Sequence, residues 1–161
     1  MSTADSRSQP PRAAPAAGNV QLLRASMDAT NAGDFEAGLS VFAPDATFDV
    51  STAGLGVFRG VAAIRAYLEE WVGTYEEQRF SEWEGEELGG GVVLALATFE
   101  SRLPGSTATV TERWAFVCRF REASIVAVTA DGDLDRARAL AAELAAETGV
   151  SADTDAGAGS T

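Results

Sequence analysis

The sequence predicts a single α+β domain in which a curved antiparallel sheet wraps around helices. Three observations indicate this fold class. Apolar residues recur at helical spacing in the first half of the chain, four successive stretches alternate with a period of two in the second half, and glycine-rich turns separate neighbouring stretches. The 161 residues, of which 46% are hydrophobic, suit one domain with one core.

The two ends of the chain differ in composition from its middle. Residues 1–18 are rich in serine, proline and alanine, and residues 149–161 consist largely of small and polar residues. Neither segment carries enough apolar surface to order itself, so both are expected to be disordered tails. The folded domain is therefore predicted over residues 19–148.

Two helices are predicted before the first strand. Asn19 is a favourable N-cap for the first helix, which should end at Gly33. Its apolar face is formed by Val20, Leu23 and Met27. Asp34 is expected to cap a short second helix that ends at Pro44. The apolar face of this second helix is formed by Phe35, Leu39 and Phe42.

A strand and the clearest helix follow. Over residues 46–51, Phe48 and Val50 alternate with polar residues, which predicts a strand with one buried side and with Asp49 pointing away from that side. After a glycine-rich loop, apolar side chains recur on one face of a long amphipathic helix. They are Val61, Ile64, Leu68, Trp71 and Tyr75.

The second half of the chain predicts four antiparallel strands and a closing helix. The strands cover residues 79–88, 92–102, 107–121 and 125–131. The last helix should be capped by Asp133 or Asp135 and should end at Gly149. Its apolar face carries Ala137, Leu140 and Leu144.

The turn over residues 104–106 sets the expected register between two of these strands. Proline and glycine in this segment predict a tight turn. That turn is expected to place Ala97 opposite Glu112 and Ala95 opposite Trp114, so that small side chains face large ones.

The composition excludes several chemistries. The formal net charge is −12, with no lysine and no histidine, so nucleic acid is not expected as a partner and neutral or cationic small molecules are better candidate ligands. Without histidine or lysine, the chain cannot supply a Ser-His-Asp or Cys-His centre, a Schiff base or an ordinary zinc site. We therefore expect no metal and no cofactor.

The location of the protein is expected to be the cytoplasm. No apolar run approaches the ~20 residues of a membrane span, and residues 1–18 lack the apolar centre of a secretory signal. Cys118 is the single cysteine, which precludes an intramolecular disulfide and suits a reducing compartment. Arginine in place of every lysine, with abundant glycine and alanine, is typical of a high-GC bacterial gene.

Several motifs recur in an order that resembles a known family. Residues 31–49, NAGDFEAGLSVFAPDATFD, combine a helix end, a Gly-Asp pair, a short helix and FAPDA at the entrance to a strand. Residues 58–60 precede the long helix, and residues 112–120 and 134–137 follow at matching spacing. These motifs resemble the SnoaL-like family of the nuclear-transport-factor-2-like (NTF2-like) superfamily. The resemblance implies a cone-shaped fold around an apolar pocket.

The resemblance implies several activities, because the family includes isomerases, polyketide cyclases, epoxide hydrolases, dehydratases and proteins without known activity. In its ketosteroid isomerases the catalytic base would match Val50, and the two oxyanion-hole donors would match Ser26 and Phe116. Proton abstraction beside a carbonyl needs a carboxylate and strong donors, which these residues do not supply. Compared with the family spacing, Gly132 and Asp133 are additional.

Glu112 is the one charged residue on the inward face predicted for residues 107–121. A carboxylate on such an apolar face would have its pKa raised by desolvation and would suit general acid or base catalysis. The alternative is that Glu112 lies at the strand end and pairs with Arg102 or Arg113. The other members of this face are Val110, Trp114, Phe116, Cys118 and Phe120.

Aromatic residues are expected to form the pocket wall or the core beside it. Trp71, Tyr75, Trp114 and Phe116 are the candidates, together with Val50 and Ser26 from the resemblance. Cys118 has no base partner in the pattern and is expected to be an inert buried thiol. Asp131, near the expected rim, is a weaker catalytic candidate.

The opposite face of residues 107–121 mixes arginine with small apolar residues. This pattern fits a solvated face or, as the resemblance implies, a homodimer interface. Its members are Arg113, Ala115, Val117, Arg119 and Arg121.

Two functions remain open at this point. The pocket would bind a small hydrophobic molecule, either as a polyketide cyclase-, isomerase- or hydrolase-like enzyme that uses carboxylate acid-base catalysis, or as a non-catalytic ligand-binding or dimerisation module.

Overall fold

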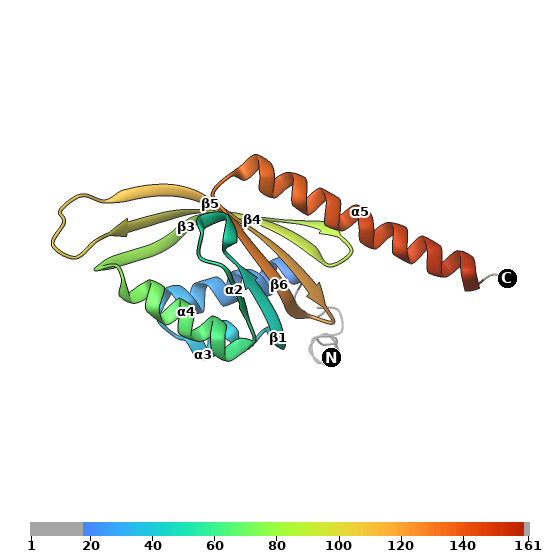
Figure 1. The fold of residues 1–161 in the computed structure, drawn as a ribbon, viewed down its shortest axis with the longest axis horizontal. Helices are drawn as coiled ribbons and strands as arrows, with labels where there is room; N and C mark the ends of the chain where they lie inside the picture. The colour runs from blue at the N-terminus through green and yellow to red at the C-terminus, as the bar shows by residue number, and fades with distance from the viewer. Residues whose placement is uncertain (1–17, 160–161) are drawn as a thin grey trace, which may run out of the picture.

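The computed structural model describes residues 18–159 and has the predicted α+β architecture (Figure 1). In chain order the elements are α2 (Asn19–Asn31), α3 (Phe35–Leu39), β1 (Phe42–Asp49), the 3-10 helix η1 (Ser51–Ala53), β2 (Val57–Arg59), α4 (Val61–Gly73), β3 (Glu77–Gly89), β4 (Val92–Arg102), β5 (Val110–Arg121), β6 (Ser124–Asp131) and α5 (Leu134–Gly159). The fold class predicted from the sequence is confirmed.

The strands form one curved sheet in the order β2-β1-β6-β5-β4-β3. Strands β1 and β6 run parallel, while every other neighbouring pair is antiparallel. The sheet is therefore mixed, which corrects the expectation of a wholly antiparallel one. The parallel pair joins segments far apart in the chain, a contact that local alternation does not reveal.

Helices cover both faces of the sheet (Figure 1). Helices α2, α3 and α4 lie on the concave side, and α5 lies across the opposite side. Strand β4 is consequently buried on both faces, because Val93, Ala95 and Phe99 face the concave side while Leu94 and Leu96 pack against α5. Burial on both faces explains why its sequence reads as a nearly continuous apolar run.

A bulge bends β3 around the helices. The pairing of β3 with β4 shifts between Ser81 and Glu84, and Glu82 adopts a positive φ of 46°. Next to this bend, the Asn31 amide at the end of α2 donates to the Phe80 carbonyl at 2.9 Å and accepts from the Phe80 N–H at 3.1 Å. This double hydrogen bond fixes α2 inside the curve of the sheet.

The first two helices differ in detail from the prediction. Gly18 is the N-cap of α2, whereas the Asn19 side chain donates to Glu87 on β3 at 2.9 Å. Asp34 caps α3 as predicted, since it accepts from the Ala37 N–H at 3.0 Å.

Helix α3 ends at Leu39, so the expectation that it carries Phe42 and ends at Pro44 is wrong. Both residues belong to β1. Pro44 is tolerated there because the pairing of β1 with β6 is interrupted between Phe42 and Thr47, where a proline removes no ladder hydrogen bond.

The last helix begins as predicted and ends later. Asp133 caps it by accepting from the Arg136 N–H at 3.0 Å. The expected end at Gly149 is wrong, because α5 continues to Gly159 and a glycine inside a helix weakens it by only about 1 kcal/mol. Of the two expected tails, residues 1–17 lie outside the described residues, and the domain boundary at residue 148 stays a prediction.

The register of β4 and β5 differs from the expected one by two residues. Glu112 lies opposite Phe99, Trp114 opposite Ala97, and Phe116 opposite Ala95. Strand β5 begins at Val110, so the connection is longer than the tight turn at residues 104–106 suggests. Because a shift of two preserves the alternation of faces, Glu112 and Trp114 still project to the concave side.

Candidate functional site

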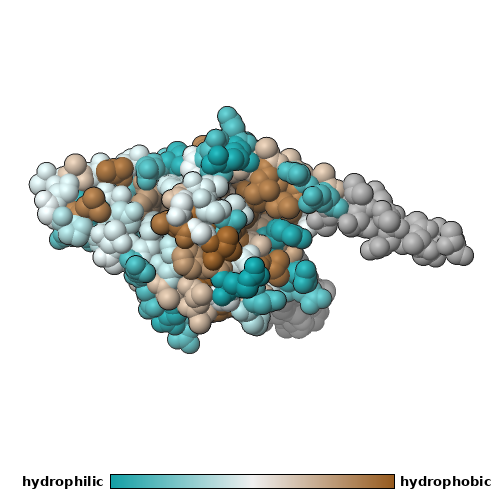
Figure 2. Space-filling view, in the orientation of Figure 1, coloured by the Kyte–Doolittle hydropathy of each residue, from teal (hydrophilic) through white to brown (hydrophobic). Residues whose placement is uncertain are grey.

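A cavity of about 320 Å³ lies between the concave face of the sheet and helices α2 and α4. Its wall is mostly aliphatic and aromatic. Three exposed lining residues, Ala53, Leu55 and Glu112, mark its mouth, and Leu55 is 52% exposed. Figure 2 shows hydrophobic residues gathered at the centre of one face, over the segment that joins β1 to β2. The mouth therefore combines an apolar rim with one carboxylate.

One wall of the cavity is a cluster of aromatic rings. The Phe99 ring lies 4.9 Å from both the Trp71 and Phe80 rings and 5.5 Å from the Tyr75 ring, measured between centroids. The Phe80 ring meets the Phe116 ring edge-on at 5.4 Å. Trp71 lies on α4, whereas Tyr75 follows the end of this helix at Gly73, which corrects the expectation that Tyr75 belongs to it. Cross-strand pairing brings Phe80 and Phe99 together. Such ring contacts stabilise this wall by about 0.5–1.5 kcal/mol per pair beyond the burial of the rings.

Three polar residues of the cavity wall serve the packing of α2. The Ser26 hydroxyl donates to the Gly38 carbonyl at 2.5 Å, and the Thr30 hydroxyl donates to the Ser26 carbonyl at 2.9 Å. A Cβ at residue 38 would collide with the Thr30 hydroxyl, so glycine permits this close approach of α3 to α2. With Asn31 bound to β3 as well, these groups are already satisfied within the protein.

Six other lining residues have side-chain nitrogen or oxygen atoms without a hydrogen bond or ion pair in the described part of the chain, namely Tyr67, Trp71, Tyr75, Gln78, Glu112 and Trp114. Burial, and secondarily the nearby Tyr75, raises the pKa of Tyr67 above its usual value. The Tyr67 hydroxyl therefore stays protonated at neutral pH and can donate a hydrogen bond to a ligand.

Glu112 is exposed and has no ion-pair partner among the described residues, so it is neither buried on an apolar face nor paired with arginine, although it does lie near the strand end as the alternative expected. It is the third residue of β5, at the open end of the cavity, so it is not buried among apolar side chains. Neither expected partner contacts it, because Arg102 pairs with Glu77 at 3.3 Å and Arg113 pairs with Glu84 at 3.5 Å. A ligand bound at the mouth would be needed to exclude water from the Glu112 carboxylate.

All the residues predicted for the site line this one cavity. They are Ser26, Val50, Trp71, Tyr75, Glu112, Trp114 and Phe116. Cys118 also lines it, and complete burial raises the pKa of its thiol to about 12, so the thiolate does not form at neutral pH. The geometry brings the predicted residues together, while their roles toward a ligand stay predictions.

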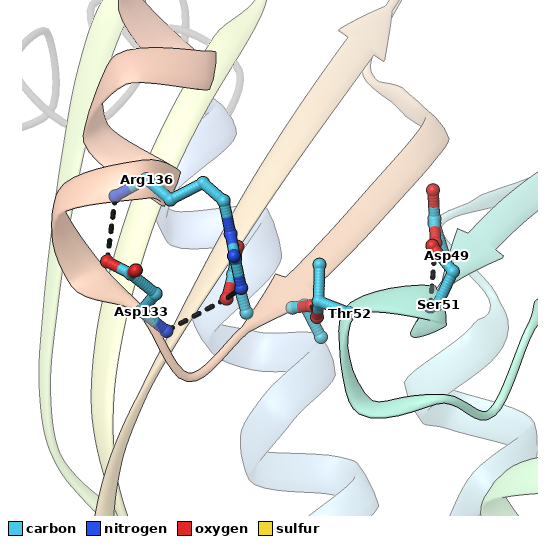
Figure 3. Close-up of polar contacts among 7 residues, drawn as sticks. Asp49, Ser51, Thr52, Asp133 and Arg136 are labelled. Atoms are coloured by element: carbon cyan, nitrogen blue, oxygen red, sulfur yellow. Dashed lines mark hydrogen bonds and ion pairs between the residues drawn. The ribbon is translucent and has the colours of Figure 1, made fainter.

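Asp49 and the weaker catalytic candidate Asp131 lie outside the cavity lining. Asp49 accepts from the Ser51 N–H at 2.9 Å (Figure 3). It does not belong to the cavity lining, in line with the prediction that it points away from the buried side. Beside it, the Thr52 hydroxyl donates to the Ala130 carbonyl at 2.9 Å, which fastens η1 to the end of β6.

Asp131 is bound to the start of α5. Its carboxylate accepts from the Arg136 side chain at 2.6 and 2.7 Å and from the Asp133 N–H at 2.8 Å, and Figure 3 shows Arg136 folded back over this turn. The hydrogen bonds from Arg136 hold the pKa of Asp131 below its usual value. The additional Gly132 and Asp133 thus form the turn and the cap of α5, and Asp131 has a structural role.

The outer face of β5 is partly covered by the chain itself. Ala115 and Val117 are 0% and 2% exposed because they pack against Ala137 and Ala141 of α5. The arginines at positions 119 and 121 remain exposed. The homodimer interface expected on this face stays a prediction, and α5 reduces the area available to it.

Sequence reasoning missed Tyr67 and Phe99 as lining residues. Tyr67 lies four residues before Trp71 on α4, and Phe99 shares the two-residue spacing, and so the face, of Ala95 and Ala97 on β4, so both patterns contained the signal. No helix in the described part has the length and hydropathy that crossing a membrane requires. Within residues 18–159, no group of three or more acidic or cysteine side chains could hold a metal ion.

Comparison with solved structures supports the fold. TerC, crystallised with polyporic acid, shares 22% identity and a TM-score of 0.65, covering 76% of this chain and 97% of its own. A candidate polyketide cyclase from Pseudomonas putida shares 21% identity and a TM-score of 0.64, covering 74% and 94%. An NTF2-like protein from Burkholderia pseudomallei shares 24% identity and a TM-score of 0.64, covering 73% and 92%.

The sequence comparison is more specific than these structural likenesses. No curated relative matches the chain. The family model described as "SnoaL-like domain" matches residues 23–128, which are more than half of the chain and include every cavity-lining residue except Ala130. By this match, together with the NTF2-like architecture, the chain belongs to the SnoaL-like family.

Proposed function

We propose that the protein binds a small hydrophobic molecule in the cavity and that it does so in the cytoplasm. The observation that carries this proposal is a cavity of about 320 Å³ whose wall is predominantly apolar and aromatic, with few unsatisfied polar groups. This is the composition of a small-molecule site, in which apolar contacts give affinity and a few polar groups give orientation.

A neutral fluorescent probe, N-phenyl-1-naphthylamine, tests this binding. Ala130 is 3% exposed and lines the cavity, so Ala130→Phe is expected to fill part of the space and to weaken probe binding about tenfold or more. Ala142→Phe, at an exposed position of α5, is the matched control and should bind like the parent. Equal binding by all three proteins would place the probe outside the cavity and would contradict the proposal.

The same site supports a cyclase-like acid-base reaction, with Glu112 as the proton-transfer group. Structural neighbours from Pseudomonas putida and Xanthomonas campestris are described as candidate polyketide cyclases. Glu112 lies at the mouth without an arginine partner, and Tyr67 offers a neutral donor to a carbonyl oxygen. A substrate covering the mouth would desolvate Glu112 at the moment when it is needed.

With a substrate that is turned over, Glu112→Gln is expected to lower kcat by about tenfold or more, because the amide keeps the shape but cannot exchange a proton. Glu86→Gln, on the face of β3 away from the cavity, provides a control with the same change in charge. An unchanged kcat in Glu112→Gln would remove Glu112 from the reaction.

A second candidate function is non-catalytic ligand binding. It is supported by the residues at the positions that serve catalysis in ketosteroid isomerases. Val50 and Phe116 have no ionisable group, and the Ser26 hydroxyl is already bound to Gly38. Under this alternative, ligand binding persists and Glu112→Gln affects no reaction.

A further inference from the structure

The charge at the mouth of the cavity is of one sign. Among the described residues that line the cavity, Glu112 is the only charged one, and no arginine belongs to the lining. The nearest arginines along the strands, Arg102 and Arg113, are held in ion pairs with other glutamates. Nothing in the lining therefore neutralises an anionic ligand, whereas a cationic group would find an unpaired carboxylate.

An aromatic surface lies beside this carboxylate. Trp114 follows Glu112 by two residues on the same face of β5, which places the two side chains about 7 Å apart along the strand. Trp114 lines the cavity and takes part in none of the ring pairs of the described chain. Its ring is half-buried against the core, and the part that lines the cavity can contact a ligand. An ammonium group between the two side chains would contact both a carboxylate and a π system.

The charge of the whole protein acts in the same direction. The net charge of −12 produces a negative potential that attracts cations and repels anions at low ionic strength. Added salt screens this long-range field with a Debye length of about 10 Å at 0.1 M, while contacts inside the mouth are screened less. Salt dependence can therefore separate the general field from the local site.

We propose that the cavity selects apolar ligands that carry a single cationic group, an amine or a quaternary ammonium, which lies between Glu112 and Trp114 at the mouth. The apolar body of the ligand occupies the aromatic cavity behind them. This inference rests on the proposed ligand-binding function and specifies the chemical class of the ligand.

Three ligands of one shape test the selectivity, namely 2-naphthylmethylammonium, 2-naphthylmethanol and 2-naphthoate, titrated by calorimetry at pH 7 in 20 mM and 300 mM salt. The cation is expected to bind about five- to tenfold more tightly than the alcohol, and the carboxylate more weakly than the alcohol. The preference should shrink at high salt without disappearing, because the local contacts remain.

Two isosteric variants separate the site from the general field. Glu112→Gln is expected to reduce the preference for the cation over the alcohol to about twofold or less, with the affinity for the alcohol unchanged. Glu86→Gln alters the net charge equally but lies on the opposite face of the sheet, so it should keep the preference of the parent. Trp114→Leu should also weaken binding of the cation more than binding of the alcohol.

The outcomes distinguish this inference from the function on which it rests. Equal affinities for the cation and the alcohol, or an equal loss of preference in both glutamate variants, would overturn the charge selectivity while leaving cavity binding intact. Failure of all three ligands to bind at millimolar concentration, together with no effect of Ala130→Phe on probe binding, would overturn both proposals.

Discussion

Replacing Phe99 with alanine is expected to lower the free energy of unfolding by about 3–5 kcal/mol. Phe99 is 2% exposed at the centre of β4, and its ring contacts those of Trp71, Tyr75 and Phe80. Removal of the ring loses the free energy of its burial and removes one of the aromatic contacts by which α4 packs on the sheet. The new void would adjoin the existing cavity, so few neighbouring side chains could move in to fill it.

Urea unfolding monitored by tryptophan fluorescence measures this effect. Val110→Ala provides the comparison, because Val110 is 51% exposed on the neighbouring strand and its truncation should cost less than about 0.5 kcal/mol. If Phe99→Ala cost less than about 1 kcal/mol, the aromatic cluster would not be the close-packed wall that the ring distances indicate.

Replacing Asp131 with asparagine is expected to lower the free energy of unfolding by about 2 kcal/mol at pH 7. The carboxylate is 4% exposed on its side chain and accepts hydrogen bonds from Arg136 and from the Asp133 N–H. An asparagine keeps one acceptor oxygen but loses the charge and turns a donor toward the guanidinium. The junction between β6 and α5 should loosen as a result.

The effect of this substitution should depend on pH. Because the folded-state pKa of Asp131 is lowered, its stabilising contribution is complete above the unfolded value of about 3.9 and is lost as the pH falls through the lower folded value. The difference in unfolding free energy between parent and Asp131→Asn should therefore be constant from about pH 5 to 7 and shrink below pH 4.

Asp135→Asn is the control for this titration, since Asp135 is almost fully exposed in the same turn and pairs only with Arg138 at 3.5 Å. The unfolding free energy of Asp135→Asn should differ little from that of the parent at every pH. A difference for Asp131→Asn that stayed constant from pH 7 down to pH 2 would show that the carboxylate charge does not stabilise the junction.

Local patterns in the sequence determined most of the elements. The apolar spacing of residues 61–75 predicted α4, the period of two between turn signals predicted β4 at its observed limits, and the aspartate caps of α3 and α5 were recognised from residue type alone. These features depend on neighbours within a few residues, which the sequence displays directly. The SnoaL-like motifs likewise identified the family and the cavity that its fold encloses.

Only the tertiary structure decided the environment of Glu112 and of the outer face of β5. The two-residue difference in register places Glu112 opposite Phe99 at the open mouth. Arg102 and Arg113, the arginines expected to pair with Glu112, instead form ion pairs with the distant residues Glu77 and Glu84. The docking of α5 covered the outer face of β5. These electrostatic and packing partners lie far from each other in the chain and are brought together only by the fold. Several arginines and glutamates could form such pairs, and sequence spacing does not indicate which of them are nearest in space.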